Sequence, residues 1–213
     1  MAETSRMKIL HIDCSPRLVS HSRRMSAAIV EAVRDRRPGA EVIRRDLGSE
    51  PLPHATSDYA NTLSSPTTLA APVAGSLELS ETLIQELEAA SAVVIGTPMH
   101  NLTVPSALKA WIDQIMRAGR TFTTTRAGKE GLLSDRPVFV AIASGGTFQR
   151  ERSWQPDFLT PYLTAIFNSI GIHSVQFFAL QATAFLDKDS APAAQAKVLA
   201  ALDLSSIEQP QTV

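Results

Sequence analysis

The sequence has one cysteine, Cys14, among 213 residues, so no disulfide framework or multi-cysteine metal site can form within one chain, and we expect no metal site. It has no excess charge of either sign, since 20 Lys and Arg balance 21 Asp and Glu. A basic excess is typical of proteins that bind nucleic acid or a membrane surface, and its absence argues against both. No apolar run approaches the roughly 20 residues of a membrane helix. Met1–Arg6 lacks the apolar stretch of a signal peptide, so we expect a cytoplasmic protein.

Short apolar runs alternate regularly with helical patterns along the chain. The runs predict five strands, over residues 8–13, 41–47, 92–96, 137–143 and 175–180. The periodic stretches predict five helices, over residues 22–36, 77–90, 105–117, 158–170 and 191–202. This alternation indicates an α/β fold with a parallel sheet and right-handed crossovers.

We expect one domain over residues 7–203, with tails at 1–6 and 204–213, the second of them a fraying polar tail. Two segments interrupt the alternation. Residues 48–76 are rich in Pro, Ser and Thr and predict a surface excursion with a helical turn. Residues 120–135 alternate and contain Gly128 and Gly131, which suggests a hairpin-like insertion.

Three loops that follow predicted strands could carry chemistry, because the carboxyl ends of parallel strands share the edge where ligands bind. Ser15, Ser20 and Ser22 surround the start of the first helix, where free N–H groups and hydroxyls suit a phosphate, although serine N-caps are common. Residues 97–105 form a proline-bracketed turn that could present N–H groups to a planar ligand or simply constrain a connection. Residues 144–147 contain two glycines that allow close backbone approach, or form a flexible loop. Together the loops suit a flat, phosphorylated ligand.

Several nucleotide and phosphate motifs are absent. The first strand is not followed by G-x-G-x-x-G, and G-x-x-x-x-G-K-[ST] does not occur, which argues against a standard dinucleotide fold and excludes a P-loop. A low-molecular-weight tyrosine phosphatase would need an arginine six positions after Cys14, and that position is Ser20. We therefore interpret Cys14 as a small buried residue.

The chain resembles the FMN-dependent NADH azoreductases, also described as NADH:quinone oxidoreductases, of the flavodoxin-like superfamily. The resemblance runs from about residue 8 to 202. It rests on segments that follow in the family's order: Pro98–Asn101, Leu108–Asp113, Arg117–Phe122, Gly131–Leu133, Ser144–Gly146, Leu159–Leu163 and Ile170–Ile172. It implies a flavodoxin-like sheet of strand order 2-1-3-4-5 with helices on both faces, bound FMN, and homodimers with active sites at the interface.

The resemblance also assigns residues to the cofactor. Ser15, Ser20, His21 and Ser22 are similar to the FMN phosphate site. Two further loops are similar to those that contact the flavin ring: Met99, His100, Asn101 and Leu102, and Ala143, Ser144, Gly145 and Gly146. Phe122 is either part of a substrate pocket in the dimer or a core or interface anchor.

Three positions depart from the family pattern. The family usually has Tyr at His100 and Phe at Leu102, and it has an arginine in the fourth-strand loop that this chain lacks. Main-chain contacts tolerate such changes, so we expect FMN binding to persist. The aromatic wall around the substrate changes, which leaves the acceptor preference open.

The resemblance implies electron transfer from NADH to quinones or azo compounds, with no obligatory acid or base from the protein. His100 is a candidate for proton delivery or, alternatively, a polar wall residue. No segment identifies a site for a 2′-phosphate, so NADH and NADPH remain alternatives. Two other functions stay open: a flavodoxin-like electron carrier or binding module, and a related NAD(P)H-dependent FMN or drug-quinone reductase.

Overall fold

The computed structural model describes residues 6–149 and 153–208. Five parallel strands form the central sheet in the order β2-β1-β3-β6-β7. They are β1 (Lys8–Asp13), β2 (Glu41–Asp46), β3 (Ala92–Pro98), β6 (Val138–Ala143) and β7 (Val175–Leu180). Because β4 and β5 belong to a separate hairpin, this is the predicted order 2-1-3-4-5, and the prediction is confirmed.

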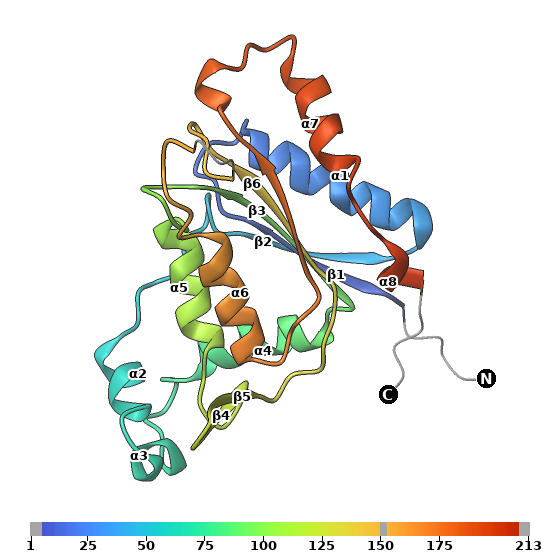
Figure 1. Cartoon of the computed structure of the whole chain (residues 1–213). Coiled ribbons are helices and arrows are strands. Elements are labelled where there is room, and N and C mark those ends of the chain that lie inside the picture. Colours follow the sequence, from blue (N-terminus) through green and yellow to red (C-terminus); the bar gives the residue numbers. More distant parts are fainter. Residues whose placement is uncertain (1–5, 150–152, 209–213) are drawn as a thin grey trace, which may run out of the picture.

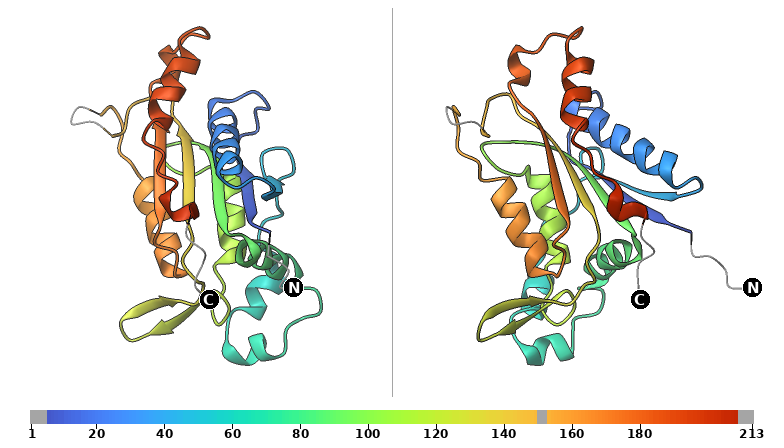
Figure 2. Two further views of the ribbon diagram at one scale, coloured as in Figure 1. Left: turned by 90° about the vertical axis from the view of Figure 1, so that its right-hand side faces the viewer. Right: turned by 45° about the vertical axis from the view of Figure 1, so that its right-hand side comes forward.

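Helices cover both faces of the sheet (Figures 1 and 2). One face carries α1 (His21–Arg36), α7 (Ala191–Leu199) and α8 (Ser205–Glu208). The other face carries α4 (Glu78–Ala89), α5 (Ser106–Ile115) and α6 (Thr160–Ser169). The two apolar layers explain why the central strands read as continuous apolar runs.

Close packing of α1 on the sheet depends on a glycine in β3. A Cβ atom on Gly96 would lie 2.5 Å from the Ser26 Oγ and 2.9 Å from the Ser22 carbonyl oxygen. Glycine therefore lets the first turns of α1 approach the end of β3. This contact fixes the start of α1 beside the carboxyl edge of the sheet.

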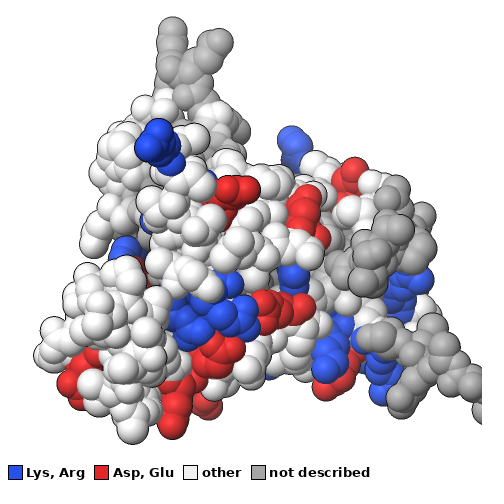
Figure 3. Space-filling model, turned by 90° about the horizontal axis from the view of Figure 1, so that it is seen from below, with Lys and Arg blue, Asp and Glu red and all other residues white. Residues whose placement is uncertain are grey.

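The two insertions form small elements at the end of the molecule opposite α7 (Figure 1). Residues 48–76 contain α2 (Ser57–Thr62) and α3 (Pro66–Ala70), and the Tyr59 hydroxyl donates to the Asp113 carbonyl at 3.1 Å. The antiparallel pair β4 (Phe122–Thr125) and β5 (Gly128–Gly131) is the expected hairpin. Basic and acidic side chains adjoin on the lower face (Figure 3), in keeping with ion pairs such as that of Glu88 with Arg120.

The expectation of a fraying tail is wrong for residues 204–208. Ser205–Glu208 forms α8, and Leu204 and Ile207 are buried in the same apolar layer as α1. Arg37 also donates to the Ile207 carbonyl at 2.9 and 3.0 Å. Two buried apolar side chains and the Arg37 hydrogen bonds therefore dock this short segment. Residues 1–5 and 209–213 lie outside the described residues. Within 6–149 and 153–208, no helix has the length and apolar character needed to cross a membrane.

Candidate functional site

A cavity of about 480 Å³ lies at the carboxyl edge of the sheet. The loops after β1, β3, β6 and β7 line it. Eight of the twelve predicted cofactor residues are among the lining residues, namely Ser15, Ser20, His21, Ser22, Met99, His100, Ala143 and Gly145. The cavity brings together the three loops that the sequence singled out.

The loop between β1 and α1 builds one end of the cavity. Ser20 is the N-cap of α1, and its hydroxyl accepts a hydrogen bond from the Arg23 backbone N–H at 3.3 Å. The Ser15 hydroxyl accepts from the Arg17 backbone N–H at 3.2 Å, and the Ser20 and Ser22 hydroxyls are 3.4 Å apart. The first N–H groups of a helix lack intrahelical acceptors, and the helix dipole is positive there. This end of the cavity therefore suits an anion.

The charge at this end comes from arginine rather than histidine. Burial lowers the pKa of His21, and the Arg24 and Arg17 charges add to this effect, so the protonated ring is disfavoured. Its Nδ1 lies 2.9 Å from the Gln195 amide nitrogen of α7. Among the described residues lining the cavity, Arg17 carries the permanent positive charge.

The loop after β3 contains a tight two-residue turn. His100 and Thr103 exchange two backbone hydrogen bonds of 3.0 Å. The two residues between them, Asn101 and Leu102, have φ values of 47° and 74°. Positive φ at both central positions is typical of type I′ turns, and for leucine it is strained. His100 and Met99 reach the cavity, whereas Asn101 and Leu102 are not among its lining residues.

The loop after β6 is tied to the loop after β3 through Ser144. Its buried hydroxyl accepts a hydrogen bond from the Gln155 side chain at 2.9 Å, and it lies 3.8 Å from the Met99 sulfur. Gly145 faces the cavity, and a Cβ atom at this position would come no closer than 3.8 Å, to the Ala184 methyl group. Ser144 and Gly146 do not line the cavity, so the predicted contacts of this loop are reduced to Ala143 and Gly145.

The loop after β7, which contains the 3₁₀ turn η1 (Thr183–Phe185), was not predicted from the sequence as part of the site. Thr183, Ala184 and Leu186 line the cavity. The Thr183 N–H and hydroxyl both donate to the Ser144 carbonyl at 3.0 Å, which places this turn beside the β6 loop. This loop could have been predicted from the topology, because every strand of a parallel sheet ends at the same edge, and the loop after the last strand therefore also lies there. Pro16, Arg17 and Pro98 were also missed, although each lies within a loop that had been singled out.

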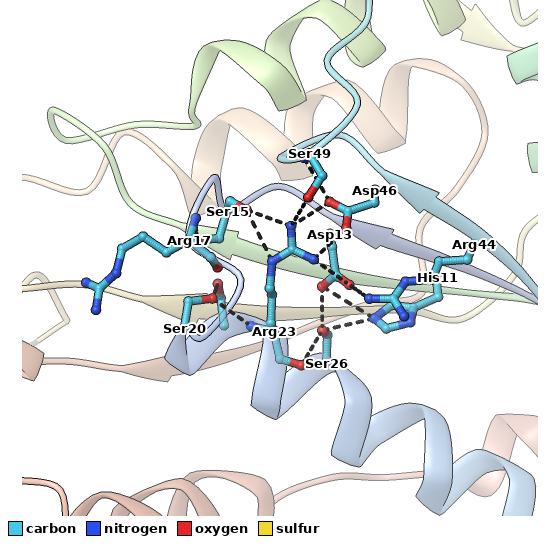
Figure 4. Close-up of polar contacts among 11 residues, drawn as sticks. His11, Asp13, Ser15, Arg17, Ser20, Arg23, Ser26, Arg44, Asp46 and Ser49 are labelled. Atoms are coloured by element: carbon cyan, nitrogen blue, oxygen red, sulfur yellow. Dashed lines mark hydrogen bonds and ion pairs between the residues drawn. The ribbon is translucent and has the colours of Figure 1, made fainter.

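A buried polar network lies beneath the β1–α1 loop (Figure 4). Arg23 is 7% exposed and donates to Asp46 at 2.8 Å and to the Ser15 carbonyl oxygen at 2.7 Å. Asp13 is 1% exposed and lies 3.4 Å from the Arg23 guanidinium. Sequence spacing gave no sign of this network, because its members come from β1, β2 and α1.

The outer part of the network surrounds the same carboxylate. Asp13 accepts from Arg44 at 3.0 Å and from the Ser26 hydroxyl at 3.1 Å. His11 is buried and lies 3.0 Å from the Ser26 hydroxyl. Burial lowers the pKa of His11 despite the attraction of Asp13. The network therefore gathers two arginines and two aspartates around a histidine whose burial disfavours the protonated ring.

Two other residues considered from the sequence do not line the cavity. Cys14 is fully buried and burial raises the pKa of its thiol, so it is not poised as a nucleophile. Phe122 is 7% exposed at the base of the hairpin, with the Lys129 ammonium 4.5 Å from its ring centre. Within this chain it lies at the opposite end from the cavity, so a role in a substrate pocket stays a prediction about a dimer (Figure 1).

Comparison with known proteins places this fold and cavity in a family. A family profile described as flavodoxin-like fold matches residues 7–204. The chain is 48% identical to the FMN-dependent NADH:quinone oxidoreductase 4 of Pseudomonas fluorescens, over 84% of this chain and 86% of that protein. It is 46% identical to the FMN-dependent NADH:quinone oxidoreductase 2 of Cupriavidus pinatubonensis, over 82% and 85% of the two chains.

A solved structure is similar across nearly the whole chain. It is an FMN-dependent NADH-azoreductase from Bacillus anthracis in complex with FMN, with a TM-score of 0.77 and 26% identity over 92% of this chain and 97% of that one. The chain thus belongs to the flavodoxin-like family, and within it to the group of FMN-dependent NADH:quinone oxidoreductases.

Proposed function

We propose that the cavity binds FMN, with the phosphate at the start of α1 and the flavin ring between the β3 and β6 loops. The residues present fit such a group. Ser15, Ser20 and the free N–H groups of α1 offer donors for a phosphate, and Arg17 offers a positive charge. Gly145 leaves room for a flat ring, and the volume of about 480 Å³ falls within the roughly 300–1,000 Å³ of ligand pockets.

We infer that the protein is an oxidoreductase that takes electrons from NADH and passes them to quinones, with azo compounds as further acceptors. When bound, FMN supplies the redox chemistry, with NADH delivering hydride before the acceptor enters in a ping-pong sequence. The protein's own groups bind and orient the ring and donate hydrogen bonds that stabilise negative charge. One observation carries the proposal: a cavity with a phosphate-binding end in a chain 48% identical to an FMN-dependent NADH:quinone oxidoreductase.

A homodimer with its sites at the interface is part of the proposal. Trp154 and Phe185 are each 74% exposed beside the cavity loops, and their ring centres are 5.8 Å apart in an edge-to-face pair. Exposed aromatic side chains of this kind are typical of surfaces that a partner or a planar substrate covers. A cytoplasmic location and the choice between NADH and NADPH stay predictions.

The first experiment is an absorbance spectrum of the purified protein, followed by anaerobic addition of NADH and then of a quinone. Flavin bands that bleach with NADH and return with quinone support the proposal. Flavin that bleaches with NADH but sustains no turnover with any quinone or azo acceptor indicates an electron carrier. Absence of flavin, with none bound on adding FMN, overturns the proposal and favours a binding module.

His100 can be tested separately as a proton donor, because it lines the cavity in the loop after β3. The His100→Gln variant removes the titratable ring, and His100→Tyr restores the residue common in the family. If His100 delivers the proton, the pH profile of kcat shifts in both variants while FMN binding is retained. An unchanged profile assigns His100 to the wall of the cavity.

A further inference from the structure

Arg23 reaches beneath the loop that we assign to the phosphate. It is the third residue of α1, directly after Ser22, which lines the cavity, and its side chain is 7% exposed. Its Nε and Nη2 atoms donate to the Ser15 carbonyl oxygen at 3.2 and 2.7 Å. Its Nη1 atom donates to Asp46 at 2.8 Å. The guanidinium therefore joins the cavity loop to the end of β2 (Figure 4).

The arrangement of the sheet explains why an arginine is needed there. Asp13 and Asp46 are the last residues of β1 and β2, and they are Cα partners in the parallel register. Two carboxylates at adjacent strand ends repel unless a cation lies between them. Arg23 contacts both, and the second cation, Arg44, contacts Asp13 from the other side. The two ion pairs hold the guanidinium in one orientation.

That orientation fixes the direction of one backbone carbonyl. The Ser15 oxygen is directed at the Arg23 guanidinium and at the β2–α2 connection, where a Cβ atom on Gly48 would come within 2.0 Å of it. Neither Arg23 nor Gly48 lines the cavity. Gly48 donates its N–H to the Asp13 carbonyl at 3.1 Å. A carbonyl turned toward the anion end of the cavity would present negative charge there, whereas this carbonyl is bound by Arg23, and Ser15 and Ser20 line that end.

We propose that Arg23 is a positioning residue for phosphate recognition, which keeps the Ser15 carbonyl out of the anion site and so makes the cavity select a phosphorylated flavin. This inference rests on the proposed function. It predicts that disturbing the Arg23–Ser15 contact lowers the affinity for FMN but leaves the affinity for riboflavin, which has no phosphate, nearly unchanged. The quantity to measure is the ratio of the two dissociation constants.

Two variants disturb the contact by different routes. Arg23→Lys keeps the charge, but an ammonium group cannot bond Ser15 and Asp46 with the fork geometry of a guanidinium. Gly48→Ala keeps every charge and places a methyl group against the Ser15 oxygen and 2.9 Å from the Arg23 Nη2 atom. If one variant fails to fold, the other still tests the contact.

A matched control separates positioning from general destabilisation. Gly131→Ala also forces a methyl group against backbone, 2.0 Å from the Gly171 nitrogen, but at the hairpin end of the molecule. Each full-length variant is freed of flavin and titrated with FMN and with riboflavin by fluorescence quenching, and its unfolding midpoint is recorded.

In Arg23→Lys and Gly48→Ala we expect the preference for FMN over riboflavin to fall about tenfold. A change of this size corresponds to roughly one charge-assisted hydrogen bond. Gly131→Ala lowers the unfolding midpoint without changing the preference. If wild-type protein prefers FMN and both variants retain that preference, or if Gly131→Ala loses it equally, the inference is overturned while the proposed function stands. If wild-type protein binds no flavin, the proposed function itself fails.

Discussion

Two buried arginines bind backbone carbonyl oxygens at opposite ends of the sheet, and their surroundings differ. Arg136, just before β6, is 7% exposed, as is Arg23. Its Nη1 atom donates to the carbonyls of Glu88 and Ala90 at 2.9 Å, where α4 ends. Burial lowers the pKa of Arg136, whereas the hydrogen bond to Asp46 raises the pKa of Arg23.

The difference shows that the same type of side chain serves two purposes in this fold. Arg136 satisfies the last carbonyls of a helix and thereby closes the amino edge of the sheet. Arg23 is held by carboxylates and acts on a single carbonyl of the cavity loop. We expect variants at the first position to change stability alone, and variants around the second to change both stability and ligand preference.

The largest effect is expected from Arg136→Met, which has a similar length but no donors. Several buried carbonyls at the end of α4 lose their partner, and we expect the free energy of unfolding to fall by about 3 kcal/mol. Urea denaturation measures this loss. The preference for FMN over riboflavin should equal that of wild type. A changed preference would show that Arg136, like Arg23, affects ligand selection as well as stability.

Asp46→Asn probes the charge that holds Arg23. The hydrogen bond from Arg23 lowers the pKa of Asp46 from 3.8 to about 2. This lowered pKa corresponds to about 1–2 kcal/mol of stability at neutral pH, because the Asp46 side chain is 22% exposed and solvent screens part of the interaction. A carboxylate with a lowered pKa stabilises the fold above its unfolded pKa, so this contribution is lost as pH falls from about 4 to about 2.

Urea titrations at several pH values should therefore show a gap between wild type and Asp46→Asn that closes in acid. Glu31→Gln is a suitable control, since that residue pairs with Arg34 on the exposed side of α1, where ion pairs contribute little. A gap that persists at about pH 2 would show that the loss comes from packing rather than from charge.

The sequence predicted the sheet because its signals are local. Runs such as residues 92–96 and 137–143 are apolar on every side, and each strand needs no information beyond its own residues. The serines before α1 and the glycines after β6 were found because strand ends define the ligand edge. The loop after β7 follows the same rule, and it was missed because its residues, Thr183, Ala184 and Leu186, have no distinctive chemistry.

The Arg23 network could not be predicted in the same way. Asp13 and Asp46 become neighbours only through the register of β1 with β2, and Arg23 faces them only because of the way α1 packs. Likewise Leu204 and Ile207 form a clear apolar pair in the sequence, but the docking of α8 depends on contacts with α1 and on the apolar layer on that face of the sheet. Contacts between distant segments are decided by tertiary packing, which spacing along the chain does not reveal.

The network also makes the cavity end sensitive to pH. His11 faces Asp13, Arg44, Arg23 and Asp46, and burial lowers its pKa below 6.5. The unfolded chain therefore binds a proton before the folded chain does, so stability falls as pH drops below about 6.5, by at most about 1.4 kcal/mol per pH unit.

His11→Gln should flatten this dependence between about pH 5 and 7, measured as urea midpoints. The control is His173→Gln, an exposed ring whose Nδ1 lies 3.0 Å from the Asn168 side chain oxygen at the other end of the sheet. Equal flattening by both variants would mean that the pH response is not specific to the cavity end.

The smallest effect concerns two turns with positive φ. The hairpin at the amino edge uses Gly128, with φ of 124°, whereas the cavity loop uses Asn101 and Leu102. Leucine at φ 74° is strained, and we expect Leu102→Gly to raise the free energy of unfolding by about 1 kcal/mol. Asn101→Gly should gain less, because asparagine tolerates this region. A loss of stability in Leu102→Gly would instead show that packing of the leucine side chain stabilises the fold by more than the backbone strain at this position costs.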